Sequence, residues 1–398
     1  LTLMFKQDAS EIFKTALSAI TSSTGWFMIL VSNLFIIAAL YFALSRFGRI
    51  RIGGPDAKPE FTTPAWYAML LSAGMGIGLM FWSVGEPMFH YSSPSPMFGD
   101  LQAQTPEAAQ AAMGVTYFHW GLHPWAIYAI VGLGLAFFAY NRGLPLTIRS
   151  VFYPLLGEKI YGFWGNLIDI LSVLATLVGL ATSLGLGVKQ VNAGLNYLFD
   201  INISITTQVG LIAAITAVAT MSVMAGLDSG VKRLSQLNMI LAALFMMFLL
   251  IVGPTIYILG GFTQNLGYYL TIFPELSLWT ETFRDTNWQG SWTVFYWAWW
   301  ISWSPFVGMF IARISKGRTV REFLLAVIFA PLIVTVLWFS TFGETALFQA
   351  ENNIGELSQG VDDVSLVLFH MLEQLPFASL ASGLAVALVF VFFVTSSD

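Results

Sequence analysis

The chain has 398 residues, of which 57% are hydrophobic and only 10% charged, whereas soluble globular domains contain about 25% charged residues. With a mean hydropathy of +0.73, this composition excludes a soluble domain and predicts an all-α integral membrane protein, because apolar runs of about twenty residues recur along it. The net charge is −5 and cysteine is absent, so disulfides, thiolate catalysis and cysteine-ligated metals are excluded.

Residues 8–24 are amphipathic and predict a surface helix ahead of the first span. A polar segment at 260–291 divides the later spans from the earlier ones. The chain begins at Leu1 and stops at Asp398 directly after an apolar run, so we expect it to be truncated at both ends. Hydropathy predicts about nine spans, at residues 25–47, 64–85, 113–140, 164–187, 205–226, 236–259, 292–313, 321–345 and from about 377.

Positive charge is distributed asymmetrically over the predicted connecting segments. Lysine and arginine concentrate on cytoplasmic loops, so the cation-rich side is expected to be cytoplasmic and the protein to be a multi-pass protein of the plasma (inner) membrane. The opposite loops are expected to hold acids, among them Glu86 and Glu344. The cation-rich side has 13 of the 17 lysines and arginines: Arg46, Arg49, Arg51, Lys58, Arg142, Arg149, Lys159, Lys232, Arg233, Arg313, Lys316, Arg318 and Arg321.

Three glycines interrupt the span predicted at 64–85, in the sequence Gly74, Met75, Gly76, Ile77, Gly78. Each glycine lowers helix stability by roughly 1 kcal/mol relative to alanine. Close helix packing through small residues explains such a motif. An unwound segment whose free backbone groups bind solute and ions, as in transporters, explains it equally well.

The span at 292–313 is the most unusual stretch, because Trp297, Trp299, Trp300 and Trp303 lie within about two turns of one helix. Trp297, Trp300 and Trp303 fall within an arc of about 120°, with Trp299 beside it, which predicts an aromatic wall. A membrane-interface belt is one interpretation. The other is a cage for a quaternary ammonium, in which each desolvated ring contributes on the order of 2 kcal/mol.

A second aromatic wall is predicted in the span at 113–140, where Trp120, Trp125 and Tyr128 share an arc of about 140°. Pro124 interrupts the backbone hydrogen bonds beside them. Core packing is the ordinary explanation for three aromatic residues on one helix. Two such walls, each followed or interrupted by a proline, favour the cage.

Titratable residues predict no catalytic centre. His119 and His123 have the spacing of a metal pair, but no nearby carboxylate or third ligand completes a site, so we interpret them as hydrogen-bonded core residues. Asp169 is an acid within a span but close enough to its cytoplasmic end to be solvated. Without a nucleophile and base, a phosphate-binding loop or a basic patch, we expect no enzyme activity, no organic cofactor and no nucleic-acid partner.

Three stretches closely resemble the betaine/choline/carnitine transporter family, and most closely its sodium-coupled glycine betaine type: GMGIGLMFWSVGEP at 74–87, HWGLHPWAIYAIVG at 119–132 and WAWWISWSPFVGMFIARISKGRTVREF at 297–323. The resemblance covers essentially the whole chain and implies two inverted five-helix repeats. We therefore expect an N-terminal surface helix and peripheral span at 1–63, the first repeat at 64–260, a periplasmic or extracellular connecting segment at 261–291 and an incomplete second repeat at 292–398.

The resemblance also implies a substrate site. Its box consists of Trp120, Trp125, Tyr128 and Trp300, with Trp303 lining the site and Trp299 beside the pathway. The glycine segment, with Gly74, Met75, Gly76 and Gly78, is expected to contact the carboxylate end of the substrate. Proton-coupled choline carriers of the family have aspartate where this chain has Gly78, which favours a zwitterion such as glycine betaine.

Sodium is the coupling ion that the resemblance implies. Oxygen donors suit this hard cation. The resemblance implies two sodium sites. The second of them maps to Thr176 and Phe306, but Leu180 stands in place of a threonine hydroxyl there. The family's sodium-independent exchangers have an arginine near the position of Asn238, where it acts as a fixed cation in place of sodium. Asn238 in this chain therefore favours ion coupling. The first sodium site maps to Ser72, Met75, the carbonyl of Phe392, Thr395 and Ser396.

These observations predict a sodium-coupled symporter of glycine betaine or a related methylated zwitterion that works by alternating access. We expect it to serve osmolyte accumulation. The family resemblance also implies a homotrimer in the bilayer. The alternatives are a sodium-independent carnitine/betaine exchanger and a proton-coupled choline carrier. A non-transporting sensor or channel is a different class, which broken helices and an aromatic barrier disfavour.

Overall fold

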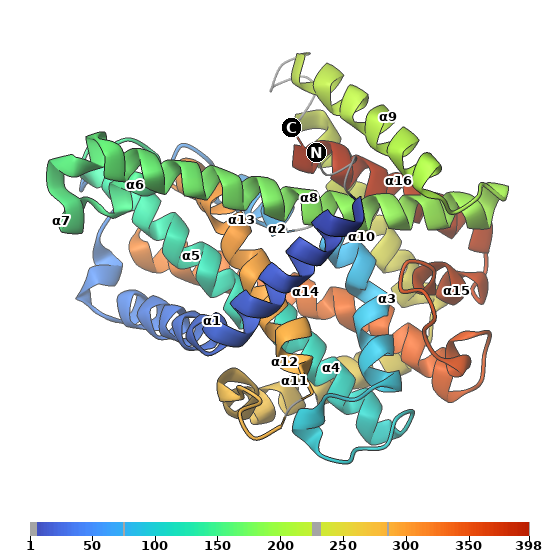
Figure 1. Cartoon of the computed structure of the whole chain (residues 1–398). Coiled ribbons are helices and arrows are strands. Elements are labelled where there is room, and N and C mark those ends of the chain that lie inside the picture. The colour runs from blue at the N-terminus through green and yellow to red at the C-terminus, as the bar shows by residue number, and fades with distance from the viewer. Residues whose placement is uncertain (1–5, 75, 225–231, 285, 398) are drawn as a thin grey trace.

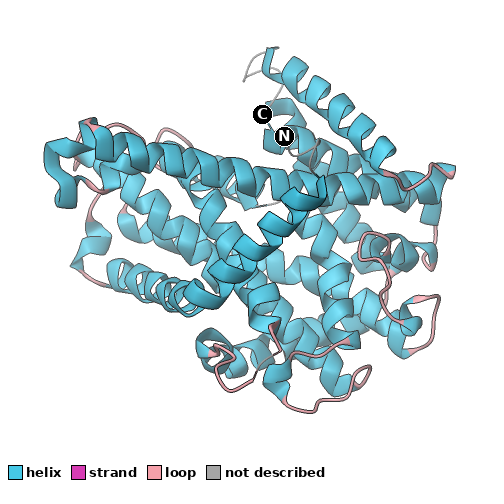
Figure 2. Cartoon of the chain, viewed as in Figure 1, coloured by secondary structure: helices cyan, strands magenta, loops and turns pink. Residues whose placement is uncertain are grey.

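The computed structural model describes residues 6–74, 76–224, 232–284 and 286–397, and in this part of the chain helices are joined by loops without a β-strand (Figures 1 and 2). The predicted all-α class is therefore confirmed. The longer helices of the N-terminal half are α1 (Lys6–Leu44), α2 (Thr63–Gly74), α3 (Ile77–Ser92), α4 (Pro106–Trp120), α5 (Leu122–Ala136), α8 (Phe163–Phe199), α9 (Ile205–Met224) and α10 (Lys232–Val252).

The short helices α6 (Ile148–Val151) and α7 (Tyr153–Leu156) lie between α5 and α8. The C-terminal half of the chain is also helical. Its elements are α11 (Thr255–Leu278), α12 (Trp288–Ser291), α13 (Thr293–Ile314), α14 (Val320–Glu351), α15 (Val367–Glu373) and α16 (Ala378–Ser397).

Four of the described helices are long and apolar enough to cross a membrane: those at Glu11–Leu44, Pro106–Asn141, Phe163–Phe199 and Val320–Glu351. Two bent pairs, α2 with α3 and α10 with α11, bring the number to six if each pair is one span. Shorter apolar helices occur at Ile205–Met221 and Ala378–Val394. The chain is thus a multi-pass membrane protein by composition and length, and the count of about nine spans stays a prediction.

Helix α1 differs from the expected surface helix followed by a separate span, because it is continuous from Lys6 to Leu44. The polar stretch near its middle does not break it. The hydroxyl groups of Thr21, Ser23 and Thr24 each donate to a carbonyl three or four residues earlier, so these side chains are satisfied inside the helix. A hydropathy profile registers their polarity but not these bonds.

Helix α11 covers most of the stretch expected to be a polar connection. It meets α10 at an angle of 108°. The bend falls at Gly253 and Pro254, and Pro254 precedes α11, where a proline without an N–H group cannot continue the preceding helix. Most of this polar stretch is therefore a helix at a steep angle to α10, and not an extended loop.

The glycine segment does interrupt its span. Helix α2 ends at Gly74, α3 begins at Ile77, and the two helices are bent by 62°. Gly76 is extended, with φ −154° and ψ −175°. Met75 lies outside the described residues. Of the two interpretations of the glycines, the broken helix therefore applies to Gly74 and Gly76.

Two cation-rich loops predicted to share a side lie together. The segment after α1 pairs with the segment between α13 and α14 through an isolated bridge of Arg51 and Thr319. Backbone hydrogen bonds of 2.9 Å join Ile52 to Arg318 and to Gly317. Glu60 accompanies these loops and forms ion pairs of 3.4 Å with Arg313 and 3.7 Å with Lys316. The two segments therefore lie on one side of the molecule, as expected, and the assignment of that side to the cytoplasm stays a prediction.

The placement of Glu86 and Glu344 in outer loops was wrong, because both carboxylates are buried inside helices. Glu86 is 0% exposed in α3, which continues through Pro87 to Ser92. Glu344 is 3% exposed in α14 and accepts a hydrogen bond from Asn265 of α11. A hydropathy window ends a span at a charged residue, but a hydrogen-bonded carboxylate can remain in the interior.

Helix α13 lies at the centre of the packing that positions the candidate site. It packs against α5, α8 and α1, while α3 packs against α4, α14 and α8. Figure 1 shows α13 and α5 running beside one another beneath the long helix α8. Side chains from both halves of the sequence therefore converge between α3, α4, α5 and α13.

Candidate substrate site: an aromatic cluster beside a buried carboxylate

Trp120 and Trp125 come from opposite sides of a helix break. Trp120 is the last residue of α4, and α5 begins at Leu122. A Cβ atom on Gly121, between them, would lie 2.3 Å from the carbonyl oxygen of Tyr117, so only glycine fits the turn. The expected interruption therefore lies at Gly121. Pro124 falls in the first turn of α5, where its missing N–H breaks no intrahelical bond.

Five of the six aromatic residues predicted for the site form one connected cluster, which we call the aromatic cluster. All five side chains are buried. Trp299 and Trp300 stack at 4.9 Å between ring centroids with an interplanar angle of 10°. The ring centroid of Trp120 lies 4.9 Å from that of Trp300 and 6.2 Å from that of Trp299. The centroid of Tyr128 lies 6.4 Å from that of Trp300 and 5.7 Å from that of Trp125. The cluster therefore consists of Trp120, Trp125, Tyr128, Trp299 and Trp300.

The predicted wall of Trp297, Trp300 and Trp303 was wrong, because the three rings face different neighbours. Trp297 stacks on His123 of α5 at 4.9 Å. Trp303 contacts Phe306 at 5.8 Å and lies where a Cβ atom on Gly179 of α8 would meet it at 3.0 Å. An arc of 120° on a helix is wide enough to face several neighbours, and α13 is packed between α5 and α8.

Gly78 lies where two rings of the aromatic cluster converge on α3. A Cβ atom at this position would be 2.9 Å from Cη2 of Trp299 and 3.0 Å from Cη2 of Trp120. Close packing therefore explains Gly78, whereas Gly76 has open space at the position of its missing Cβ. The two interpretations of the glycine motif apply to different glycines.

Three indole N–H groups of the cluster are engaged. Trp299 donates to Oγ of Ser183 on α8 at 3.1 Å, and Trp300 donates to the carbonyl of His119 at 3.2 Å. Trp120 donates to Oε2 of Glu86 at 2.7 Å. The buried N–H of Trp125 has no acceptor among the described residues, which leaves one donor available to a ligand. Sequence reasoning missed Ser183, because a lone serine in a span carries no signal.

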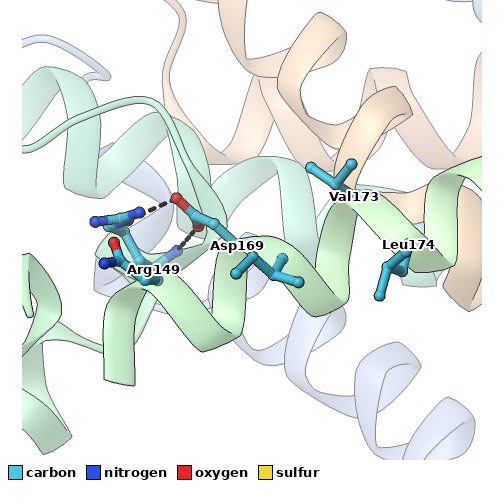
Figure 3. Close-up of a pocket in the computed structure, with 6 residues that line it drawn as sticks. Arg149, Asp169, Val173 and Leu174 are labelled. Carbon is cyan, nitrogen blue, oxygen red and sulfur yellow. Dashed lines mark hydrogen bonds and ion pairs between the residues drawn. The ribbon is translucent and has the colours of Figure 1, made fainter. Parts of the chain in front are cut away.

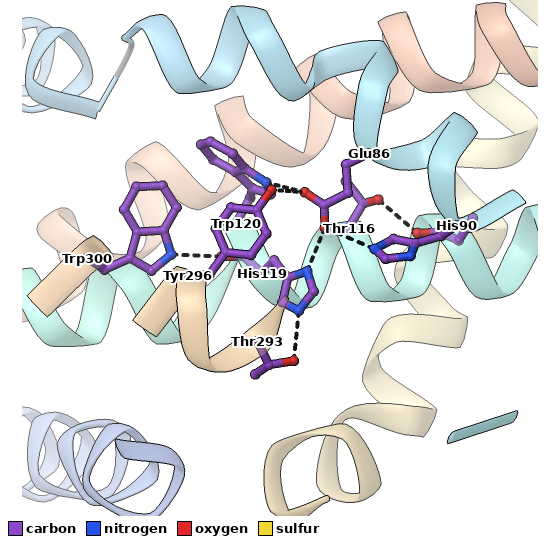
Figure 4. Close-up of polar contacts among 9 residues, drawn as sticks. Glu86, His90, Thr116, His119, Trp120, Thr293, Tyr296 and Trp300 are labelled. Carbon is purple, nitrogen blue, oxygen red and sulfur yellow. Dashed lines mark hydrogen bonds and ion pairs between the residues drawn. The ribbon is translucent and has the colours of Figure 1, made fainter. Parts of the chain in front are cut away.

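Glu86 is the centre of a buried hydrogen-bond network (Figure 4). Its Oε1 accepts from Nδ1 of His119 at 2.5 Å, and its Oε2 accepts from Trp120 and, at 2.6 Å, from the hydroxyl of Tyr296. Nε2 of His119 contacts Oγ1 of Thr293 at 2.9 Å. The network joins α3, α4 and α13. The sequence does not reveal this network, because Glu86 is a charged residue at the end of an apolar run and hydropathy places it in a loop.

The prediction that no carboxylate lies near His119 was wrong, because Glu86 is bonded to it. Ligand atoms of Glu86, His90 and His119 lie within 4.8 Å of one another, and two imidazoles with a carboxylate form a donor set that suits Zn²⁺. The short hydrogen bond between His119 and Glu86 would have to break to admit an ion. His123 is not part of the group, since Gly121 separates it from His119 and its Nε2 contacts Asn33 at 3.3 Å.

Sodium-site residues are only partly within the described structure. Ser72 lies in α2 and donates to the carbonyl of Met69 at 2.8 Å, and Phe392 is buried in α16. Met75 and the side chains of Thr395 and Ser396 lie outside the described residues. At the second predicted site, Oγ1 of Thr176 donates to the carbonyl of Ser172 at 2.9 Å and Phe306 is 46% exposed.

A surface groove lies at the start of α8 (Figure 3), and none of the residues that line it belongs to the aromatic cluster. Nε of Arg149 pairs with Oδ2 of Asp169 at 2.6 Å, and both side chains remain about one fifth exposed, at 21% and 22%. The acid that we placed near the cytoplasmic end of its span is thus neutralised by an arginine. The groove has a volume of about 430 Å³ and is lined by Arg149, Asn166, Asp169, Ile170, Val173 and Leu174.

Comparison with known proteins points to one family. A family model described as BCCT, betaine/carnitine/choline family transporter, matches residues 1–398. A glycine betaine/proline/choline transporter of Vibrio parahaemolyticus is 50% identical over 411 aligned residues, which cover 100% of this chain and 74% of the relative. Glycine betaine transporter 1 of the same organism is 49% identical over 390 residues, covering 97% and 74%. A glycine betaine transporter of Bacillus subtilis is 46% identical over 393 residues, covering 98% and 75%.

Proposed function

This chain belongs to the betaine/carnitine/choline family of transporters, and we propose that it imports glycine betaine or a related methylated zwitterion as a sodium-coupled secondary transporter. Members of the family are multi-pass membrane transporters and not enzymes, so the question is which solute this chain carries and what drives it. Alternating access, the homotrimer and a role in osmoprotection are further parts of the proposal.

The aromatic cluster is the observation that carries the proposal. Its rings come from α4 and α5 on one side and from α13 on the other, which belong to the two different predicted repeats. Indole and phenol faces attract a trimethylammonium group without a hydrogen bond or a counter-charge. Relative motion of the two repeats would change how these rings enclose the solute, as alternating access requires.

The opposite end of a zwitterion needs a different environment. Helix α3 begins immediately after the open, extended Gly76, and the first N–H groups of a helix are unpaired and attract anions. Gly78, the second residue of α3, lies against the rings of Trp120 and Trp299. A solute with its ammonium group against the cluster and its carboxylate toward this helix end would match both environments.

Sodium coupling is supported by the family and by the position of the predicted first site. Ser72 precedes the break between α2 and α3, and Phe392 lies in α16, which packs against α3. An ion between them would stabilise the broken helix that also faces the solute. The second site is weaker, since Leu180 stands there in place of a threonine hydroxyl and offers no side-chain oxygen.

Uptake of radiolabelled glycine betaine into proteoliposomes containing the full-length protein tests the proposal. We expect concentrative uptake with an inward sodium gradient and none with potassium in its place. Sodium-independent exchange would refute the coupling and leave the substrate. Binding without counterflow of labelled solute would contradict transport altogether, and preferential uptake of choline or carnitine would replace glycine betaine as the substrate.

A further inference from the structure

Glu86 places a full negative charge directly behind the aromatic cluster. We propose that this carboxylate is a positioning residue that orients Trp120 and makes the site select solutes with a cationic head group. The inference rests on the proposed function and deepens it. Its basis is the set of contacts drawn in Figure 4, where the side chains of Trp120, Tyr296 and His119 all turn toward Glu86.

The hydrogen-bond partners are those expected of an ionised carboxylate. An indole nitrogen can only donate, so Trp120 donates to Oε2. Thr293 has a hydroxyl that can donate to Nε2 of His119, which leaves the proton of a neutral imidazole on Nδ1, facing Oε1 at 2.5 Å. The hydroxyl of Tyr296 donates to Oε2. With three donors directed at its two oxygens, the carboxylate has no need of its own proton.

Among the described residues, no lysine or arginine forms an ion pair that neutralises this charge. The ion pairs that include Glu86 in this part of the chain involve only His119 and His90. The contact with His90 is long, at 3.6 Å, and neither ring nitrogen of His90 has a hydrogen-bond partner in the described structure. Neutral donors stabilise a buried anion without cancelling its field, which remains strong in a surrounding of low polarity.

Trp120 connects that charge to the site. Its N–H donates to Glu86, while its ring meets Trp300 at 4.9 Å and an interplanar angle of 70°. The hydrogen bond fixes how the indole is rotated within the aromatic cluster. Donation to an anion also polarises the ring and makes its face more negative. Both effects strengthen the attraction between the cluster and a cation.

The clearest test compares glycine betaine with 3,3-dimethylbutyrate, which has the same shape but a neutral carbon in place of the ammonium nitrogen. Each compound competes with radiolabelled glycine betaine for binding to the full-length protein in proteoliposomes. The measured quantity is the ratio of the two inhibition constants. In the wild-type protein we expect a strong preference for glycine betaine. If neither glycine betaine nor 3,3-dimethylbutyrate binds, the proposed function itself is refuted.

Glu86→Gln keeps the size of the side chain and removes its charge. We expect the preference for glycine betaine to fall on the order of tenfold, which corresponds to about 1.4 kcal/mol. Equal weakening of both compounds, with an unchanged ratio, would overturn the inference, because a purely structural role affects both alike. Glu344→Gln is the matched control, since it removes another buried carboxylate that has no contact with the aromatic cluster, and its ratio should equal that of the wild type.

Glu86→Asp supplies a second measurement that also serves if Glu86→Gln fails to fold. It keeps the charge but shortens the side chain, so the hydrogen bond to Trp120 is weakened. We expect lower affinity for both compounds with a ratio within about threefold of the wild-type ratio. A ratio that falls tenfold or more in Glu86→Asp would show that side-chain length, and not charge, sets the preference, and would overturn the inference.

Discussion

Two carboxylates among apolar helices, Glu86 and Asp169, show opposite ways of keeping an acid in a membrane protein. Asp169 pairs with the guanidinium of Arg149 at 2.6 Å and remains partly exposed. Glu86 is fully buried and accepts hydrogen bonds from side chains on α4 and α13. The acid paired with arginine holds local structure, whereas we infer that the acid beside the aromatic cluster, which has no lysine or arginine partner among the described residues, acts on the solute. Changes at the cluster should therefore alter binding, and changes at the groove should alter stability alone.

The largest effect is expected from Trp300→Leu. Trp300 contacts Trp120, Tyr128 and Trp299, and loss of one desolvated ring should cost about 2 kcal/mol of binding energy, or roughly 30-fold in affinity. Competition binding with labelled glycine betaine measures it.

Trp164→Leu is the control for that variant, because Trp164 lies on α8 with 53% of its side chain exposed. Its affinity for glycine betaine should match that of the wild type. Unchanged affinity in Trp300→Leu would remove the aromatic cluster from the site.

Gly78→Ala should have the next largest effect. The added Cβ atom would lie 2.9 Å from Trp299 and 3.0 Å from Trp120, so the rings must shift, at a typical cost of about 1–3 kcal/mol. We expect about tenfold weaker glycine betaine binding together with a lower melting temperature. Gly210→Ala in α9 is the control, since no atom lies within 4 Å of its added Cβ. Wild-type affinity in Gly78→Ala would mean that the two rings can separate without loss.

Asp169→Asn tests the other side of the comparison and should have the smallest effect. An ion pair that is one fifth exposed contributes about 1 kcal/mol or less, so the melting temperature should fall by only a few degrees. The affinity for glycine betaine should not change. A large loss of affinity would show that the groove and the aromatic cluster are coupled, and that the two acids do not differ in role as we infer.

Local features of the sequence determined the class of the protein and most of the candidate residues. Hydropathy and charge placement are properties of short windows, so they identified a helical membrane protein and placed on one side the two loops that the structure pairs at Arg51 and Thr319. The motifs around Gly78, Trp120 and Trp300 are contiguous, and the last of them is highly specific, so together they identified the family and the rings of the aromatic cluster. The glycines likewise indicated the break between α2 and α3.

Contacts between distant segments were decided only by the tertiary structure. Helical periodicity grouped Trp297 and Trp303 with Trp300, but the packing of α13 between α5 and α8 separates them. Hydropathy placed Glu86 in a loop, because it scores the charge of a residue and cannot see donors 33 to 210 positions away in the chain. The carboxylate is buried only because the folded chain brings Trp120, His119 and Tyr296 to it, and that arrangement exists in no single stretch of sequence.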